Sequence, residues 1–205
     1  MTAITMPPLH PNCRCSTYGK VELSDKRISP VESIEFDLWN SSYPHMENIT
    51  GEYVDGKLHE PNIKISSSVT IDGTTYIVDG HNVVSDHSNY EYKVASWLSS
   101  KTGLKVEILP RVNQPEKINT PDYLLDGVSF DLKEITGSGK NVLDGNLRKA
   151  KKQAPNIIFD ITKTPLLEEE IMEQLNQIYK VGRRGLEISI IKKRDELLSV
   201  LKPRG

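Results

Sequence analysis

Hydrophobic residues recur at helix and strand periods only from about residue 66 onwards. Upstream, residues 21–65 are rich in Pro, Ser, Asn and acidic side chains, and turn formers interrupt them repeatedly, which indicates an irregular arm or linker with a few short strands. In the segment SSVTIDGTTYIVDG, alternating apolar positions on both sides of Asp72-Gly73 predict a β-hairpin with a tight turn. We therefore expect the regular fold to begin with this hairpin.

Helices and strands then alternate along the rest of the chain. Apolar residues at helical spacing predict a helix that starts near residue 88 and stops at Gly103. Further on, the pattern predicts three strands (LKVEIL, PDYLLDG, VSFDLKEI), a basic helix (142–154), a buried strand (NIIFDI), an amphipathic helix (LLEEEIMEQLNQIYK) and a final strand (LEISII). This order predicts an α/β fold, a mixed β-sheet flanked by helices, behind an irregular N-terminal arm.

Composition and charge narrow the classes of protein that fit this pattern. Hydrophobic residues make up 37% and charged residues 26% of the 205 residues, which excludes a disordered polyelectrolyte. No apolar run is long enough for a membrane span. Lys and Arg number 26 against 28 Asp and Glu, so a wholly basic nucleic-acid coat is excluded, but a local basic patch is not.

Three acidic residues and a lysine indicate metal-assisted chemistry on a phosphodiester. Asp122 follows Pro121 at the start of one strand, and Asp131 and Lys133 leave the same face of the next strand. Two carboxylates on adjacent strands can bind Mg²⁺, with Mn²⁺ as the alternative, and such a metal lowers the pKa of a bound water. Lys133 can orient that water or stabilise transition-state charge, and Glu91 on the preceding helix can add a ligand.

Cations downstream of these carboxylates indicate a nucleic-acid substrate. Arg148, Lys151 and Lys152 fall at i, i+3 and i+4, so they share a helix face that can contact phosphates, although a solvated helix shows the same pattern. Amides beside them and an arginine pair in a Gly-flanked loop extend the predicted RNA contacts. The full set is Lys140, Asn146, Arg148, Lys149, Lys151, Lys152, Gln153, Arg183 and Arg184.

The order Glu91, Pro121-Asp122, Asp131-x-Lys133 resembles the restriction-endonuclease-like PD-(D/E)xK superfamily. More narrowly, the run PDYLLDGVSFDLKEITGSGKNVLDGNLRKAKKQAPNIIFDIT is similar to the C-terminal tRNase domain of contact-dependent growth-inhibition CdiA toxins. The resemblance covers roughly residues 88–200. It implies a restriction-endonuclease-like core in which Glu91, Asp122, Asp131 and Lys133 are catalytic and the three carboxylates bind the metal.

A second resemblance lies at the N-terminal end. The segment PPLHPNCRC resembles the C-terminal signature of phage Mu F-like head-morphogenesis proteins. His10, Cys13 and Cys15 supply three soft ligands within six residues, so a zinc site completed by another segment is one interpretation. An ordered loop without metal is the other.

The two resemblances divide the chain into a head-protein tail (1–20), a linker or irregular arm (21–65) and a nuclease toxin domain (66–205). They imply an endoribonuclease that hydrolyses tRNA in the cytoplasm of a bacterial target cell, with a virion-associated stage before delivery as an option. The expected partners are RNA, an immunity protein and phage capsid or portal proteins. Two alternatives stay open: a metal-independent barnase- or EndoU-like RNase that uses histidines such as His87, and a non-enzymatic virion module.

Overall fold

The computed structural model describes residues 41–205 except 50, 52, 151, 152 and 183. The expected head-protein tail, with the zinc ligands His10, Cys13 and Cys15, therefore lies outside the described residues, as does the first part of the expected arm. None of the helices in the described part has the length and hydropathy needed to cross a bilayer.

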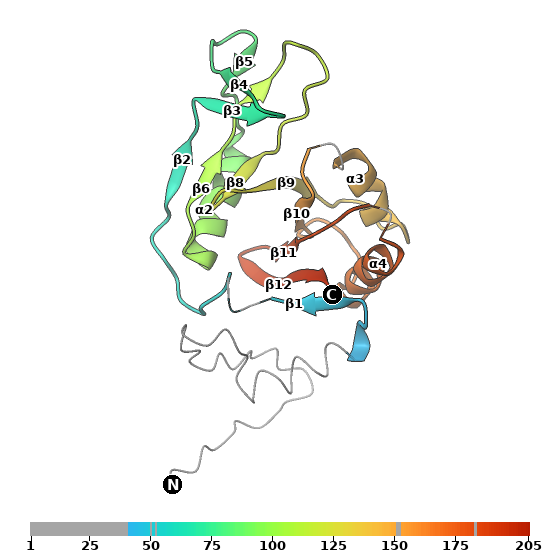
Figure 1. Cartoon of the computed structure of the whole chain (residues 1–205). Helices are drawn as coiled ribbons and strands as arrows, with labels where there is room; N and C mark the ends of the chain where they lie inside the picture. The colour runs from blue at the N-terminus through green and yellow to red at the C-terminus, as the bar shows by residue number, and fades with distance from the viewer. Residues whose placement is uncertain (1–40, 50, 52, 151–152, 183) are drawn as a thin grey trace.

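One mixed β-sheet organises the described residues. Its strand order is β1-β12-β11-β10-β9-β8-β6-β2 (Figure 1). Strand β10 runs parallel to both β9 and β11, and β2 runs parallel to β6, whereas the other neighbouring pairs are antiparallel. The bounds are β1 Met46–Asn48, β2 Ile63–Ile65, β6 Val106–Ile108, β8 Tyr123–Leu125, β9 Val128–Glu134, β10 Asn156–Asp160, β11 Ser189–Lys193 and β12 Glu196–Pro203. This architecture confirms the predicted fold class.

Helices cover both faces of the sheet. Helix α2 (Asn89–Thr102) packs on one face, and α3 (Val142–Ala150) and α4 (Glu168–Val181) pack on the other (Figure 1). Along β10 the side chains alternate, so that Phe159 lies in the core with α3 and α4 while Ile158 lies in the core with α2. The continuous apolar run of this strand follows from its burial on both faces.

Two predicted chain reversals are confirmed. Gly103 ends α2 with a left-handed φ of 71°, a conformation that costs glycine little. Asp72 and Gly73, both at positive φ, join β3 (Ser68–Ile71) to β4 (Thr74–Ile77) in the expected hairpin. Beside it, β5 (Val83–Val84) pairs with β7 (Arg111–Val112), and Val69, Val83 and Val112 form a small core of their own.

The arm contains short strands, as predicted, but the sequence pattern does not indicate that they join the main sheet. Within the expected arm, β1 and β2 become the two outermost strands, because each pairs with a later strand through its backbone and needs only three residues to do so. The prediction that LEISII is the final strand is wrong. After a turn at Arg194, with φ 52°, the chain returns as β12 and pairs antiparallel with β11.

Candidate functional site

The site is built around the middle of β9. Asp131 pairs in register with Ile157 and Lys133 with Phe159, both of which face α3 and α4, so the two charged side chains leave that same face. The Asp131 side chain is fully buried, and that of Lys133 is 20% exposed. The Lys133 ammonium contacts Oδ2 of Asp131 in an ion pair. The common face predicted from the spacing is therefore present.

A tight hairpin brings Asp122 beside this pair. Asp126 and Gly127, both at positive φ, connect β8 to β9 and set Asp122 just beyond the last paired residue of β8. The Asp122 backbone N–H donates to the Phe130 carbonyl at 3.1 Å, and its Oδ2 accepts from the Leu132 N–H at 2.6 Å. The Asp122 carboxylate is thus held against β9, next to Asp131.

Burial and charge together determine how Asp131 ionises. Burial raises its pKa to about 8, the neighbouring Asp122 carboxylate raises it as well, and Lys133 opposes both by lowering it. Apart from the ion pair with Lys133, neither carboxylate oxygen of Asp131 has a hydrogen-bond partner among the described residues. A buried carboxyl without hydrogen bonds lowers the stability of the fold, and a pKa shifted in this way is typical of a functional position.

The carboxylate pair fits a hard divalent cation. Asp122 and Asp131 offer oxygen donors side by side. Apart from the ion pair of Oδ2 with Lys133, the Asp131 oxygens lack the hydrogen bonds that a purely structural aspartate would make. In the described part of the chain, no three His, Cys, Asp or Glu side chains converge into a metal site. A cation here would therefore complete its shell with water and substrate oxygens, which is usual for Mg²⁺.

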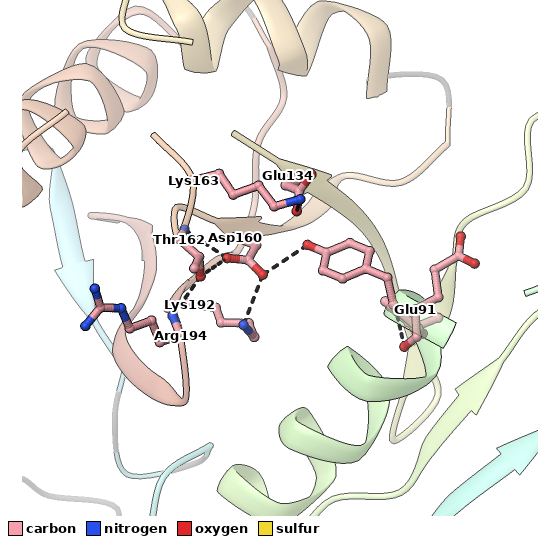
Figure 2. A network of polar contacts seen from close by, with 9 residues as sticks. Glu91, Glu134, Asp160, Thr162, Lys163, Lys192 and Arg194 are labelled. Atoms are coloured by element: carbon pink, nitrogen blue, oxygen red, sulfur yellow. Dashed lines mark hydrogen bonds and ion pairs between the residues drawn. The ribbon is translucent and has the colours of Figure 1, made fainter. Parts of the chain in front are cut away.

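Glu91, the third predicted ligand, caps helix α2. Its Oε2 accepts from the Ser88 N–H at 2.5 Å, while the Ser88 hydroxyl accepts from the Glu91 N–H at 3.1 Å. The Glu91 carbonyl accepts from the Tyr123 hydroxyl at 2.9 Å. Figure 2 shows the Glu91 carboxylate directed away from the buried network around Asp160. The spacing Ser88-x-x-Glu91 is itself a capping-box signal, so the sequence carried a structural explanation for this glutamate.

Glu91 and Asp122 nevertheless share one cleft. The cleft has a volume of about 410 Å³ and adjoins a second one of about 480 Å³, with Pro121 and Gln153 at their common wall. Three carboxylates against one guanidinium, that of Arg111, line the first cleft, so it repels anions unless a cation is bound. Its lining residues are Asp86, His87, Ser88, Glu91, Ile108, Leu109, Arg111, Thr120, Pro121, Asp122 and Gln153.

Gln153, predicted as an RNA contact, bridges two parts of the site. Its Oε1 accepts from the Lys133 ammonium at 3.3 Å, and its Nε2 donates to the Thr120 carbonyl at 3.4 Å. The side chain therefore holds the lysine over the carboxylates and ties the end of α3 to the segment before Asp122. Local sequence patterns do not indicate this role, because it depends on contacts with residues 20 and 33 positions away along the chain.

The other predicted RNA contacts fall into three groups. Lys140 and Arg148 are exposed, as a phosphate contact requires. Asn146 donates to the Val142 carbonyl at 2.8 Å, and Arg184 forms a two-pronged ion pair with Asp144 at 2.6 and 2.5 Å, so both are engaged within the fold. Lys151, Lys152, Arg183 and the side chain of Lys149 lie outside the described residues.

A second buried polar cluster, which sequence reasoning missed, lies on the opposite face of the sheet (Figure 2). Asp160 is only 2% exposed, and its Oδ2 accepts from the Lys192 ammonium and the Tyr90 hydroxyl, each at 3.0 Å. Its Oδ1 accepts from the Thr162 N–H at 3.0 Å and hydroxyl at 2.5 Å. Burial alone would raise the pKa of Asp160, but these bonds from Thr162 and Lys192 outweigh it, and the pKa lies below its ordinary value.

This cluster fixes the start of α2. Tyr90, in the first turn of the helix, reaches Asp160 on β10, and the Lys192 ammonium lies 5.3 Å from the centre of the Trp97 ring on the same helix. The cluster therefore clamps α2 to β10 and β11. Because Glu91 and His87 belong to that end of the helix, the clamp also sets one wall of the cleft.

Comparisons with known proteins give one family match and one similar solved structure. The family model for the contact-dependent growth inhibition CdiA C-terminal domain matches residues 119–197, a stretch that includes Asp122, Asp131, Lys133 and Gln153. Among solved structures, the chain is similar to one from the CdiA-CT/CdiI toxin and immunity complex from Burkholderia pseudomallei, at 21% identity and a TM-score of 0.47. That similarity covers 69% of this chain and 99% of the other. No curated protein matches.

Proposed function

We propose that this chain carries an endoribonuclease toxin of the contact-dependent growth-inhibition type, which hydrolyses tRNA with the help of a divalent cation. The observation that carries the proposal is the pair of adjacent carboxylates, Asp122 and Asp131, with Lys133 in contact with the buried one. The family match over residues 119–197 supports it, because that stretch contains all three residues.

Charge in the cleft supports a bound cation. A phosphodiester entering beside Asp122 and Glu91 would meet net negative charge, and a divalent cation held by Asp122 and Asp131 removes that repulsion. When bound there, Mg²⁺ or Mn²⁺ would supply a polarised phosphoryl oxygen and a water of lowered pKa. Oε2 of Glu91 accepts the helix-capping hydrogen bond from Ser88, so its other oxygen, Oε1, would be the one available to the cation.

The chain's own residues have distinct tasks in this proposal. The Lys133 ammonium stabilises negative charge that develops on the phosphoryl group, because it is a donor already placed at the site. Gln153 orients that ammonium from the other side through its 3.3 Å hydrogen bond. Asp122, fixed by the Leu132 N–H, keeps its position as charge changes around it.

RNA binding and protection of the producing cell complete the proposal. The exposed Lys140 and Arg148 lie on the loop before α3 and on α3 itself, where they can contact the tRNA backbone. An unrestrained RNase would kill its maker, so we expect a small acidic immunity protein that covers this helix or the cleft. The toxin would act in the cytoplasm of the target cell.

The link to a phage particle rests on the N-terminal resemblance alone. The segment PPLHPNCRC and its neighbours belong to the part of the chain that lies outside the described residues. A virion-associated stage, contacts with capsid or portal proteins, and zinc binding by His10, Cys13 and Cys15 therefore stay predictions.

Expression in bacterial cells tests the toxin proposal. Wild-type protein is expected to stop growth, whereas Lys133→Ala, which removes the ammonium at the carboxylates, should permit growth at an equal protein level. Lys163→Ala is the matched control, because that lysine is 63% exposed and pairs with Glu134 away from the site, so this variant should stay toxic. Growth arrest by Lys133→Ala as strong as by wild type would contradict the proposal.

The same assay tests for the immunity partner. Co-expression of the open reading frame next to the toxin gene is expected to restore growth of cells that make the wild-type protein.

A second candidate function has one observation in its favour. His87 lines the same cleft as Asp122 and Glu91, so a metal-independent RNase could use it as an acid or base. The two candidates differ in their response to chelation, since only the first loses activity in EDTA.

A further inference from the structure

An aromatic pair stands at the start of α2. His87 immediately precedes the helix cap Ser88, and Tyr92 lies in the first turn of the helix. Their ring centroids are 6.2 Å apart, with the ring planes inclined by 32°. The two rings therefore form a short, tilted surface on one side of the helix end.

Packing in the hydrophobic clusters does not account for the exposed ring of Tyr92. Tyr92 is 43% exposed and belongs to none of the hydrophobic clusters of the described residues, whereas its neighbour Tyr90 packs against the core with α2. Nδ1 of His87 is buried and has no hydrogen-bond partner among the described residues. A ligand that stacks on the Tyr92 ring would remove apolar surface from water, which favours the complex.

The pair stands beside the proposed reaction site. His87 lines the same cleft as Asp122, Gln153 and Arg111. A phosphate held near Asp122 would thus have an aromatic surface within reach of an adjoining base. Arg111 offers a guanidinium to the next phosphate, at the cost of its ion pair with Asp86.

We propose that His87 and Tyr92 form a stacking platform for an unpaired nucleobase next to the cleaved phosphate. The inference rests on the proposed function and narrows its substrate class. Bases inside an A-form duplex are stacked on each other and cannot reach a side chain, whereas bases in loops and at single-stranded ends stack readily on aromatic rings. The enzyme therefore cleaves RNA in a loop or single-stranded end and not within a paired stem.

A cycle of enzyme variants and substrates tests the platform. The first substrate is the shortest single-stranded RNA that the wild-type protein cleaves, with the position of the cut mapped. The second and third are abasic versions of this RNA, one without the base on the 5′ side of the cut and one without the base on the 3′ side. Tyr92→Ala should raise KM for the intact RNA about 10-fold with kcat nearly unchanged. On one of the two abasic RNAs, Tyr92→Ala and wild type should have the same KM, because the base that stacks on the platform is missing there. Tyr92→Phe, which keeps the ring, should behave as wild type on all three.

The outcomes separate the platform from the nuclease. If Tyr92→Ala changes KM equally on intact and abasic RNA, or not at all, the platform is wrong while the nuclease stands. If His87→Ala lowers kcat and leaves KM unchanged, His87 acts in the chemistry and the platform is again wrong. If no RNA is cleaved, the probe is a short single-stranded RNA that carries one 2-aminopurine base. Quenching of its fluorescence by wild type and Tyr92→Phe, but not by Tyr92→Ala, would keep the platform without the nuclease. Equal quenching by all three would overturn it.

Discussion

Asp131→Asn is expected to abolish RNA cleavage and at the same time to stabilise the fold. The loss of activity should be at least about 100-fold, because the amide can neither hold a cation as a carboxylate does nor attract the Lys133 ammonium. The gain in stability follows from burial. The carboxyl is fully buried, has no hydrogen-bond partner apart from its ion pair with the partly exposed Lys133, and has a pKa raised to about 8, so the uncharged amide of the same shape suits the position better.

The size of the stabilisation can be measured directly. Thermal unfolding in EDTA at pH 7.5 should show a higher midpoint for Asp131→Asn by about 3–6 °C, corresponding to about 1–2 kcal/mol for a protein of this size. Asp126→Asn is the matched control: the residue lies in the turn of the same β-hairpin, is exposed, and sits at a φ of 46° that asparagine tolerates. Asp126→Asn should keep the RNA-cleaving activity and the thermal unfolding midpoint of the wild type. A less stable or still active Asp131→Asn protein would contradict the account of this site.

Asp160→Ala is expected to destabilise the protein by about 3–5 kcal/mol, because it leaves the buried Lys192 ammonium without its anionic partner. Lys192 is only 8% exposed, and the contact of its ammonium with the Trp97 ring cannot replace the lost negative charge. The Tyr90 hydroxyl loses its acceptor in the same step, so the first turn of α2 is released from β10.

Urea unfolding measures this effect best in the Lys133→Ala background, where toxicity should not limit expression. Glu134→Ala is the control, since Glu134 pairs in register with Asp160 on the neighbouring strand but forms its ion pair with an exposed lysine. Its cost should not exceed about 1 kcal/mol. If Asp160→Ala costs no more than Glu134→Ala, the buried cluster does not clamp α2.

The sequence predicts those parts of the structure that depend on residues close together along the chain. The period of two along VSFDLKEI predicts that Asp131 and Lys133 share a face, and they do. The Asp72-Gly73 hairpin and the end of α2 at Gly103 follow from residues that accept positive φ. The alternation of strands and helices predicts the mixed sheet.

The parts that the sequence did not predict depend on partners far away along the chain. The sequence predicts Gln153 as an RNA contact, and only the fold brings it to Lys133. Asp160 and Lys192 are 32 residues apart, and each alone is an ordinary strand-end charge. Strand β1 is short and β12 is irregular in pattern, so their conformation depends on strand pairing: β12 pairs with β11, and β1 pairs with β12.

The most direct test of the central claim is cleavage of total bacterial RNA by purified protein. Wild type and Lys133→Ala are each incubated with Mg²⁺, with Mn²⁺ and with EDTA, and the products are resolved by size. We expect discrete tRNA fragments from wild type with either metal, and none in EDTA or from Lys133→Ala. Cleavage that survives both EDTA and the loss of Lys133 would move the chemistry to His87, and no cleavage under any condition would contradict the nuclease altogether.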